Sequence, residues 1–136
     1  MLISNFHSTI SNKLTMNQYL NIYNLEERTA KFGENIIIFC KTIKQDTITK
    51  PIINQIIRSG TGMGANYMEA NSASSRRDFR NKIYICKKEI EETKHWLRMI
   101  AIAVPFKKDE CRKLWQEAQE LTMIFQKIVN TLNKKK

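Results

Sequence analysis

Apolar residues recur at intervals of three and four positions along four separate stretches of this 136-residue chain. That spacing places them on one face of an α-helix. Alternating strand-type runs are few, and four glycines and two prolines leave few turns. The sequence therefore predicts an all-α fold, an antiparallel up-down-up-down four-helix bundle. The first expected helix runs from about Asn24 to Thr42 or Lys44, and a polar connection, Gln45–Thr49, follows it. The second runs to Ala70 with Pro51 in its first turn, the third from Ser75 to about Ala103, and the fourth from about Lys107 towards the C-terminus.

Each expected helix has a face that should contribute to one core. The predicted core faces comprise Leu25, Thr29, Phe32, Ile36, Phe39 and Ile43; Ile53, Ile56, Gly60, Met63, Tyr67 and Ala70; Phe79, Ile83, Cys86, Ile90, Thr93, Leu97, Ile100 and Val104; and Cys111, Leu114, Ala118, Leu121, Phe125, Ile128 and Leu132. Cys40, Cys86 and Cys111 are odd in number and form no Cys-x-x-Cys pair. We expect buried reduced thiols rather than a disulfide framework or a zinc site.

The polarity of the chain divides it into three parts. Residues 1–23 form a polar leader rich in Asn, Ser and Thr, residues 24–133 form the bundle domain, and residues 134–136 form a basic tail. We interpret the leader as loosely ordered, with a short amphipathic docking segment as the alternative, and Met16 as a candidate natural start. The sequence shows no secretory signal and no run of the ~20 apolar residues that a membrane span needs. A cytoplasmic protein without a membrane partner is expected.

The stretch from Arg58 to Ala70 holds three of the four glycines inside an expected helix. A glycine there costs roughly 0.5–1 kcal/mol relative to alanine, so close helix packing is the simplest reason for Gly60, Gly62 and Gly64. Gly60 and Gly64 lie one turn apart and should open one face, whereas Gly62 points elsewhere. A phosphate loop is excluded, because the pattern matches neither nucleotide-binding fingerprint and no strand precedes it.

Two of the expected helices carry apolar residues away from their core faces. These are Ile37 and Ile38 on the first helix, and Ile85, Trp96 and Met99 on the third. A helix with two apolar faces has two surfaces to bury, so these residues predict an interface with further copies of the chain. Scattered exposed apolar residues are the alternative, and they are common.

The formal net charge is +10, which favours polyanionic partners such as RNA, DNA or an anionic membrane surface. The third expected helix carries most of the candidate nucleic-acid-binding residues in a basic stripe and its margin: Arg76, Arg77, Arg80, Lys87, Lys94 and Arg98. Such a stripe can follow a phosphate backbone. The alternative is a solvated face with intrahelical pairs such as Lys87–Glu91 and Lys88–Glu92.

No catalytic constellation can be placed from the residues. Glu92 and His95 form a Glu-x-x-His, half of the motif that a di-iron bundle uses twice. The only other histidine is His7, in the leader, so a surface role for His95 is the better interpretation. We expect no enzyme activity, no metal and no cofactor.

Four stretches together resemble the bacterial "four helix bundle protein" family, whose members include proteins encoded in intervening sequences of large-subunit ribosomal RNA genes. The resemblance is carried by Leu25–Phe32, Arg58–Ala70, and Ser75–Phe79 with Lys87–Leu97, and it extends from Tyr23 to the C-terminus without the leader. It implies a homopentamer with a basic surface that associates with nucleic acid. It also implies structural roles for Arg58, Asn66 and Glu69, with any partners of Arg58 and Glu69 on other helices.

The accessory variability determinant of diversity-generating retroelements is a related member of that family, and its pentamer binds a reverse transcriptase and RNA. Two functions therefore stand beside each other for this chain. The first is a non-enzymatic homo-oligomer that binds RNA or DNA through its basic helical surface. The second is a protein-interaction scaffold, or accessory subunit, for a partner enzyme such as a reverse transcriptase.

Overall fold

The computed structural model describes residues 24–134. Within this range there is no strand, so the predicted all-α fold is confirmed. The predicted leader, with Met16 and His7, and the last two residues of the predicted tail lie outside the described residues. The elements are α3 (Leu25–Lys41), α4 (Thr49–Asn71), α5 (Arg76–Ala103), the short 3-10 turn η1 (Pro105–Lys107) and α6 (Lys108–Lys134).

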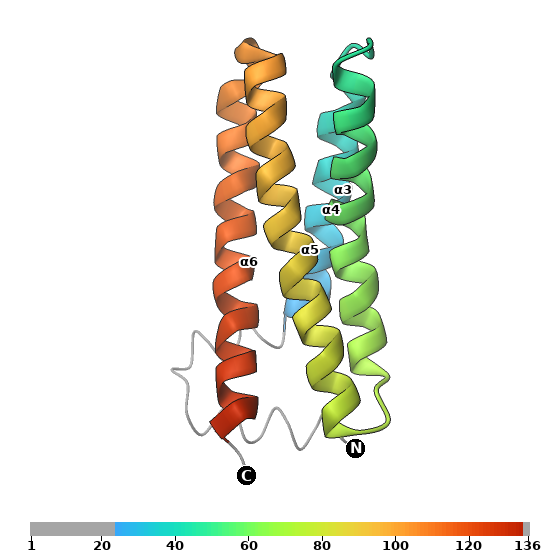
Figure 1. Ribbon diagram of the computed structural model, residues 1–136, viewed down its shortest axis with the longest axis vertical. Coiled ribbons are helices and arrows are strands. Elements are labelled where there is room, and N and C mark those ends of the chain that lie inside the picture. Colours follow the sequence, from blue (N-terminus) through green and yellow to red (C-terminus); the bar gives the residue numbers. More distant parts are fainter. Residues whose placement is uncertain (1–23, 135–136) are drawn as a thin grey trace.

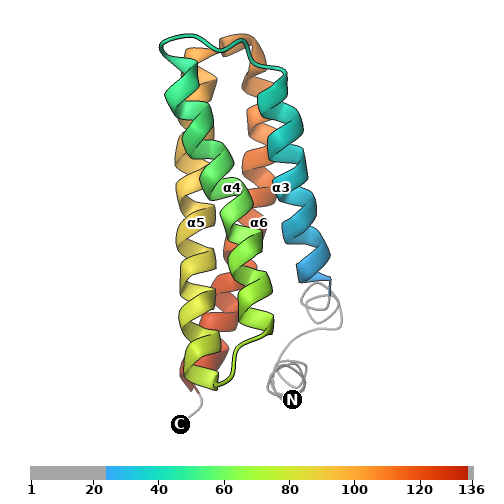
Figure 2. The same ribbon diagram turned by 90° about the vertical axis from the view of Figure 1, so that its right-hand side faces the viewer.

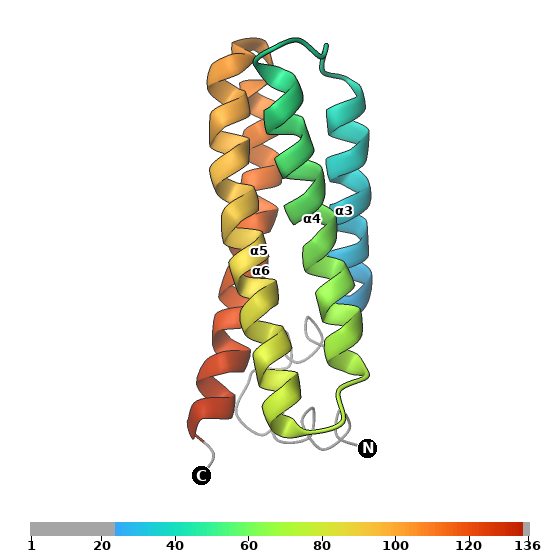
Figure 3. The same cartoon turned by 45° about the vertical axis from the view of Figure 1, so that its right-hand side comes forward.

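The four helices lie side by side along the long axis of the molecule (Figure 1). One end carries the connection from α3 to α4, and the opposite end carries the connection from α4 to α5 (Figure 2). Each helix packs on two others: α3 on α4 and α6, and α5 on α4 and α6. Turning the molecule shows α5 and α6 side by side near the end where one leads into the other, and further apart towards the opposite end (Figure 3).

The core is made by the faces that the apolar spacing predicts. All of those residues are buried, except Leu114, which is partly buried. Phe32, Phe79 and Phe125 are among its largest fully buried side chains. The three cysteines are buried and free, as predicted. Burial raises the pKa of Cys86 to about 12, so this thiol is neutral at physiological pH.

The helix starts follow local capping chemistry. The Ser75 hydroxyl accepts a hydrogen bond from the Asp78 backbone N–H at 3.0 Å, which confirms the predicted cap of α5. Asn24 occupies the cap position of α3, as predicted, but its side chain makes no capping bond. Pro51 lies in the first turn of α4, as predicted, but the helix already begins at Thr49, which was expected to end the connection. The reason is Asp46, whose carboxylate accepts the backbone N–H groups of Ile48 and Thr49 at 2.8 Å each.

Glycines bring α3 and α4 close together. A Cβ added to Gly64 would lie 3.2 Å from the backbone oxygen of Thr29, and one added to Gly60 would lie 3.0 Å from the Ile36 side chain. Gly33 of α3 faces the Thr61 backbone of α4, with a 3.5 Å gap to an added Cβ, a contact that the sequence interpretation did not include. Gly62 faces α5 instead, 3.7 Å from the Glu89 carboxylate. Gly60 and Gly64 thus lie in one helix contact and Gly62 beside another.

Polar side chains tie α4 to α5. Arg58 donates to Glu89 at 3.2 Å and to Glu92, and Lys82 donates to Glu69 at 2.6 Å. The ion-pair partners of Arg58 and Glu69 therefore lie on another helix, as expected, while Arg58 also donates to the Gln55 side chain of its own helix at 3.1 Å. Deeper in the same contact, the fully buried hydroxyls of Ser59 and Thr93 are 2.8 Å apart. The Ser59 hydroxyl also donates to the Gln55 backbone oxygen at 3.0 Å. These bonds satisfy polar groups that would otherwise be costly to bury.

Candidate nucleic-acid interface

The predicted basic stripe lies on the side of α5 that borders α6. Arg76 donates to the backbone oxygen of Leu132 at 2.9 Å, and Lys94 donates to the Gln119 side chain at 2.7 Å. Both acceptors belong to α6. The opposite flank of α5 carries Glu89 and Glu92, which face Arg58 of α4. Helical spacing therefore places Arg76 and Lys94 of α5 along α6, and Glu89 and Glu92 along α4, where Lys82 is also paired with Glu69.

Most of the predicted phosphate-binding residues have no acidic partner. Within residues 24–134, Arg77, Arg80 and Arg98 lie in no ion pair with a carboxylate, and neither do Arg76 and Lys94. Arg77 and Arg98 are exposed, and Arg76, Arg80 and Lys94 are partly buried. The positive charge on this side of α5 is consequently not neutralised by nearby carboxylates.

The alternative interpretation of the basic stripe predicted two ion pairs within α5, Lys87–Glu91 and Lys88–Glu92, and the structure contains one of them. Lys87 does approach Glu91, at 3.9 Å, so one predicted pair is present. For Lys88–Glu92 the structure gives another arrangement, in which the Glu92 carboxylate accepts hydrogen bonds from Arg58 and from the Trp96 ring N–H. An exposed helical pair such as Lys87–Glu91 contributes only about 0.3–0.5 kcal/mol and is readily exchanged for a phosphate.

Two acidic residues of α6, Glu117 and Glu120, lie on its other side, towards α3. Arg28 of α3 binds Glu117 at 2.8 Å and Glu120 at 3.1 Å. Burial by itself lowers the pKa of Arg28, but its hydrogen bonds and charge interactions with both carboxylates outweigh that effect and raise it. The guanidinium is thus always charged, and it holds two carboxylates away from the side where α6 meets α5.

The structure adds α6 residues that the sequence interpretation missed: Lys108, Arg112, Trp115 and Gln119. Their spacing of four, three and four puts them on one side of α6, which is the signal by which they can be found. Lys94 lies 5.3 Å from the centre of the Trp115 ring, within the range of a cation–π interaction. We define the α5–α6 face as Arg76, Arg80, Lys87, Lys94 and Arg98 of α5 with Lys108, Arg112, Trp115 and Gln119 of α6.

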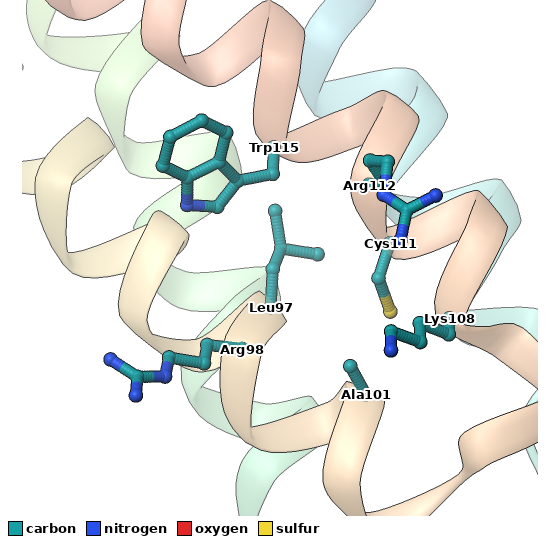
Figure 4. Close-up of a pocket in the computed structure, with 7 residues that line it drawn as sticks. All are labelled: Leu97, Arg98, Ala101, Lys108, Cys111, Arg112 and Trp115. Carbon is teal, nitrogen blue, oxygen red and sulfur yellow. The ribbon is translucent and has the colours of Figure 1, made fainter.

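A surface pocket of about 350 Å³ lies at the end of this face nearest η1. It is lined by Leu97, Arg98, Ala101, Lys108, Cys111, Arg112 and Trp115. Figure 4 shows Leu97 and Ala101 of α5 between the Trp115 indole on one side and the Lys108 side chain on the other. Burial raises the pKa of Cys111 to about 11, so the thiol that lines the pocket is neutral. The pocket combines an apolar floor with three cations.

The residues predicted to form an interface between copies of the chain differ in how exposed they are. On α3, Ile37 is 43% exposed and Ile38 is 61% exposed, and Ile85 on α5 is 37% exposed. Trp96 and Met99 are only partly buried, but Trp96 packs against the core and its ring N–H reaches Glu92 at 3.2 Å. Trp96 therefore already contributes to its own bundle, and Ile37, Ile38 and Ile85 offer more free apolar surface.

His95 is exposed, in agreement with the predicted surface role, and its ring meets the Trp96 ring edge-to-face with centroids 4.9 Å apart. In the described range, His, Cys, Asp and Glu side chains form no group of three or more that could hold a metal ion. None of the described helices is long and apolar enough to cross a membrane.

A protein from the S23 ribosomal protein family of Bacteroides thetaiotaomicron, solved by crystallography and described as having unknown function, resembles this fold. The two chains are 28% identical with a TM-score of 0.67, over 76% of this chain and 96% of that one. A search of curated proteins finds no match.

The family model described as "23S rRNA-intervening sequence protein" matches residues 15–134. The match begins before Tyr23, so it includes residues that the predicted boundary left in the leader. Because it covers well over half of the chain, the protein belongs to the 23S rRNA-intervening sequence protein family.

Proposed function

We propose that this protein is a non-enzymatic, homo-oligomeric helical protein that binds RNA or DNA through the α5–α6 face. The observation that carries the proposal is the segregation of charge. Arg80 and Arg98 have no carboxylate partner in the described range, and Arg28 holds Glu117 and Glu120 of α6 on the far side. The remaining acid beside the face, Asp109, makes only an exposed pair with Arg112. Lys, Arg and polar side chains of α6 extend the same surface.

The dimensions of the face suit a phosphate backbone. From Arg76 to Arg98 the helix rises roughly 33 Å, at 1.5 Å per residue. A helical nucleic-acid strand places one phosphate about every 3.4 Å, so this length corresponds to about ten nucleotide steps. Each phosphate that a cation neutralises releases condensed counterions, and binding should therefore weaken steeply as salt is added.

Removing three of the predicted phosphate-binding cations of α5, two of them on the α5–α6 face, should weaken binding by about tenfold or more at 50 mM salt. The variant carries Arg77→Gln, Arg80→Gln and Lys87→Gln, and its matched control carries Lys31→Gln, Lys41→Gln and Lys50→Gln on α3 and α4. Fluorescence anisotropy with a 20-nucleotide RNA and a 20-base-pair DNA, at 50 and 200 mM salt, measures both affinity and salt slope. For the single strand the slope should fall by about 2 in the α5 variant.

The control decides whether the face or only the net charge matters. If both triple variants weaken binding equally, the α5–α6 face has no special role. If the unmodified protein binds neither probe at 50 mM salt, the proposed function is wrong.

Assembly into a homo-oligomer is part of the proposal, with an antiparallel up-down-up-down bundle as its subunit and five copies as the expected number. The alternating ends of the connections in Figure 2 support the antiparallel arrangement, and the exposed apolar residues on α3 and α5 support a contact between copies. Several copies would also repeat the α5–α6 face around the assembly and strengthen its field.

An Ile38→Glu substitution should reduce the mass in solution from a multiple of 16.0 kDa to that of a single chain. A carboxylate buried in an apolar interface without a partner is strongly unfavourable. Ile48→Glu is the matched control, because Ile48 is equally exposed, at 62% against 61% for Ile38, but lies outside the predicted interface. Light scattering gives the mass, and a single-chain mass for the unmodified protein would contradict assembly.

A protein-interaction scaffold for a partner enzyme, such as a reverse transcriptase, is the second candidate. The observation that favours it is the pair Ile102 and Phe106, which are 78% and 84% exposed where α5 ends and η1 begins. Capture of a defined partner by the unmodified protein and not by an Ile102→Ser, Phe106→Ser variant would support this function.

A further inference from the structure

The pocket at the η1 end of the α5–α6 face has a composition that a phosphate-tracking stripe alone does not need. Its floor is apolar, with Leu97 and Ala101 from α5. Its wall includes Trp115, a large aromatic ring that is 40% exposed. A phosphate backbone is contacted by cations, whereas an aromatic ring on an apolar floor suits a flat, uncharged group.

Three cations line the pocket: Arg98, Lys108 and Arg112. None of the lining residues is acidic. Of these cations, Arg112 lies 3.6 Å from the Asp109 carboxylate, and both side chains of this pair are largely exposed, at 59% for Arg112 and 90% for Asp109. Such a pair contributes little, so Arg112 can exchange Asp109 for a phosphate.

The aromatic wall is held in place before any ligand arrives. Lys94 donates to Gln119 at 2.7 Å and lies 5.3 Å from the centre of the Trp115 ring. Lys94 is therefore a positioning residue that connects α5 to the indole. A ring that is already ordered loses less conformational entropy when a second ring stacks on it.

We propose that this pocket binds an unpaired base of a single-stranded nucleic acid, stacked on Trp115, while Arg98, Lys108 and Arg112 contact the phosphates on either side of that base. The inference rests on the proposed function and adds a preference for single strands to it. Bases in a duplex are already stacked on their neighbours and cannot enter the pocket without unpairing. Stacking is tolerant of sequence, because every base has a π-face.

The volume is consistent with this occupant. About 350 Å³ is at the lower end of the range for small-molecule sites, which suits one base rather than a large cofactor. The neutral thiol of Cys111 adds no charge to the floor. A free nucleotide has the same chemistry, a base with a phosphate, so the test must separate the two sources.

The first test compares Trp115→Leu with the unmodified protein on a 15-nucleotide uridine oligomer and on a 15-base-pair duplex. Affinity for the single strand should fall about 5- to 100-fold, the loss expected for removing one stacking platform. Affinity for the duplex should change less than twofold, because the cations remain. Trp115→Phe retains a π-face and should restore most of the single-strand affinity, which a merely structural role for Trp115 would not explain.

The second test uses fluorescence. The chain has two tryptophans, so in a Trp96→Phe background the emission comes from Trp115 alone. Titration with the uridine oligomer should quench this emission with the same midpoint as binding measured by anisotropy. This readout needs only the folded Trp96→Phe protein, and it therefore remains decisive if Trp115→Leu fails to fold.

The outcomes separate this inference from the proposed function. If the oligomer binds but neither quenches the Trp115 emission nor loses affinity in Trp115→Leu, the pocket is not a base site. The proposed function is then still tested separately, by the loss of affinity in the triple variant of α5. If uridine monophosphate quenches Trp115 as strongly as the oligomer at equal concentration, the pocket is a site for free nucleotides and the single-strand proposal is overturned. If neither the oligomer nor the duplex binds at low salt, both proposals fail.

Discussion

Gly64→Val should lower the free energy of unfolding by about 2–3 kcal/mol, whereas Gly62→Ala, two residues away on the same helix, should raise it by about 0.5–1 kcal/mol. Both substitutions remove a flexible glycine from the interior of α4, which by itself favours the helix. The opposite signs arise from what each new side chain meets.

At Gly64 the neighbour cannot move aside. An added Cβ would lie 3.2 Å from the oxygen and 3.4 Å from the carbonyl carbon of Thr29, and both atoms belong to the α3 backbone. Valine adds two further methyl groups and has one strongly preferred rotamer in a helix, so it cannot turn away from α3. At Gly62 the nearest atoms are 3.7 and 3.8 Å away, in the Glu89 carboxylate, which is ordinary van der Waals contact.

Denaturant unfolding followed by circular dichroism measures the two changes. Because assembly makes apparent stability depend on concentration, all proteins are compared at one chain concentration. Equal stability of Gly64→Val and the unmodified protein would mean that α3 and α4 do not approach each other at Thr29.

Between pH 8 and pH 10 the free energy of unfolding should fall by about 1.4 kcal/mol more for the unmodified protein than for Cys86→Ala. Burial raises the pKa of Cys86 from its ordinary value near 9 to about 12. The carboxylates of Glu89 and Glu69 act in the same direction, while Lys82 acts in the opposite one.

The sign follows from proton binding. Below pH 9 both the folded and the unfolded chain hold the thiol proton, and the stabilisation is fully present. As the pH rises from 9 to 12 only the unfolded chain releases the proton, so the stability that the thiol contributes is lost through this window. Tyr67 is also buried, and its raised pKa depends partly on the charge of Cys86. The Tyr67 contribution is therefore the same in both proteins only while the folded Cys86 thiol is neutral, as it is up to pH 10.

Cys86→Ala is expected to be less stable at pH 8, because it removes a fully buried side chain atom. The informative quantity is therefore the difference between the two proteins at each pH, measured by denaturant unfolding in the presence of a reductant. A difference that stays constant from pH 8 to pH 10 would show that the Cys86 thiol is not shielded from ionisation.

The helices and the core could be predicted from the sequence because an amphipathic helix encodes its buried face in local spacing. Ile83, Ile90 and Leu97 are seven residues apart and all are buried. The cap of α5 was equally readable, since Ser75 and Asp78 interact within one turn. The first turn of α4 was readable from Pro51, and the bond from the Thr49 backbone N–H to the Asp46 carboxylate, which fixes its first residue, is equally local.

Only the α5 part of the candidate site could be predicted from the sequence. The cations of α5 share one helix, so their common side follows from their numbers alone. Trp115 and Arg112 are far from Arg98 in the sequence, and only the packing of α6 beside α5 places the three around one pocket. The same packing turns Glu117 and Glu120 towards Arg28 and away from the basic stripe.

The sequence by itself determined four amphipathic helices, their buried faces, the neutral buried thiols and a basic side on α5, since each depends on residues a few positions apart. The tertiary structure decided which helix lies beside that basic side, which carboxylates are held away from it, and which glycines meet a backbone rather than a side chain. Those outcomes depend on contacts between residues distant in the chain, which are set only when the packing of the four helices fixes their neighbours and rotations.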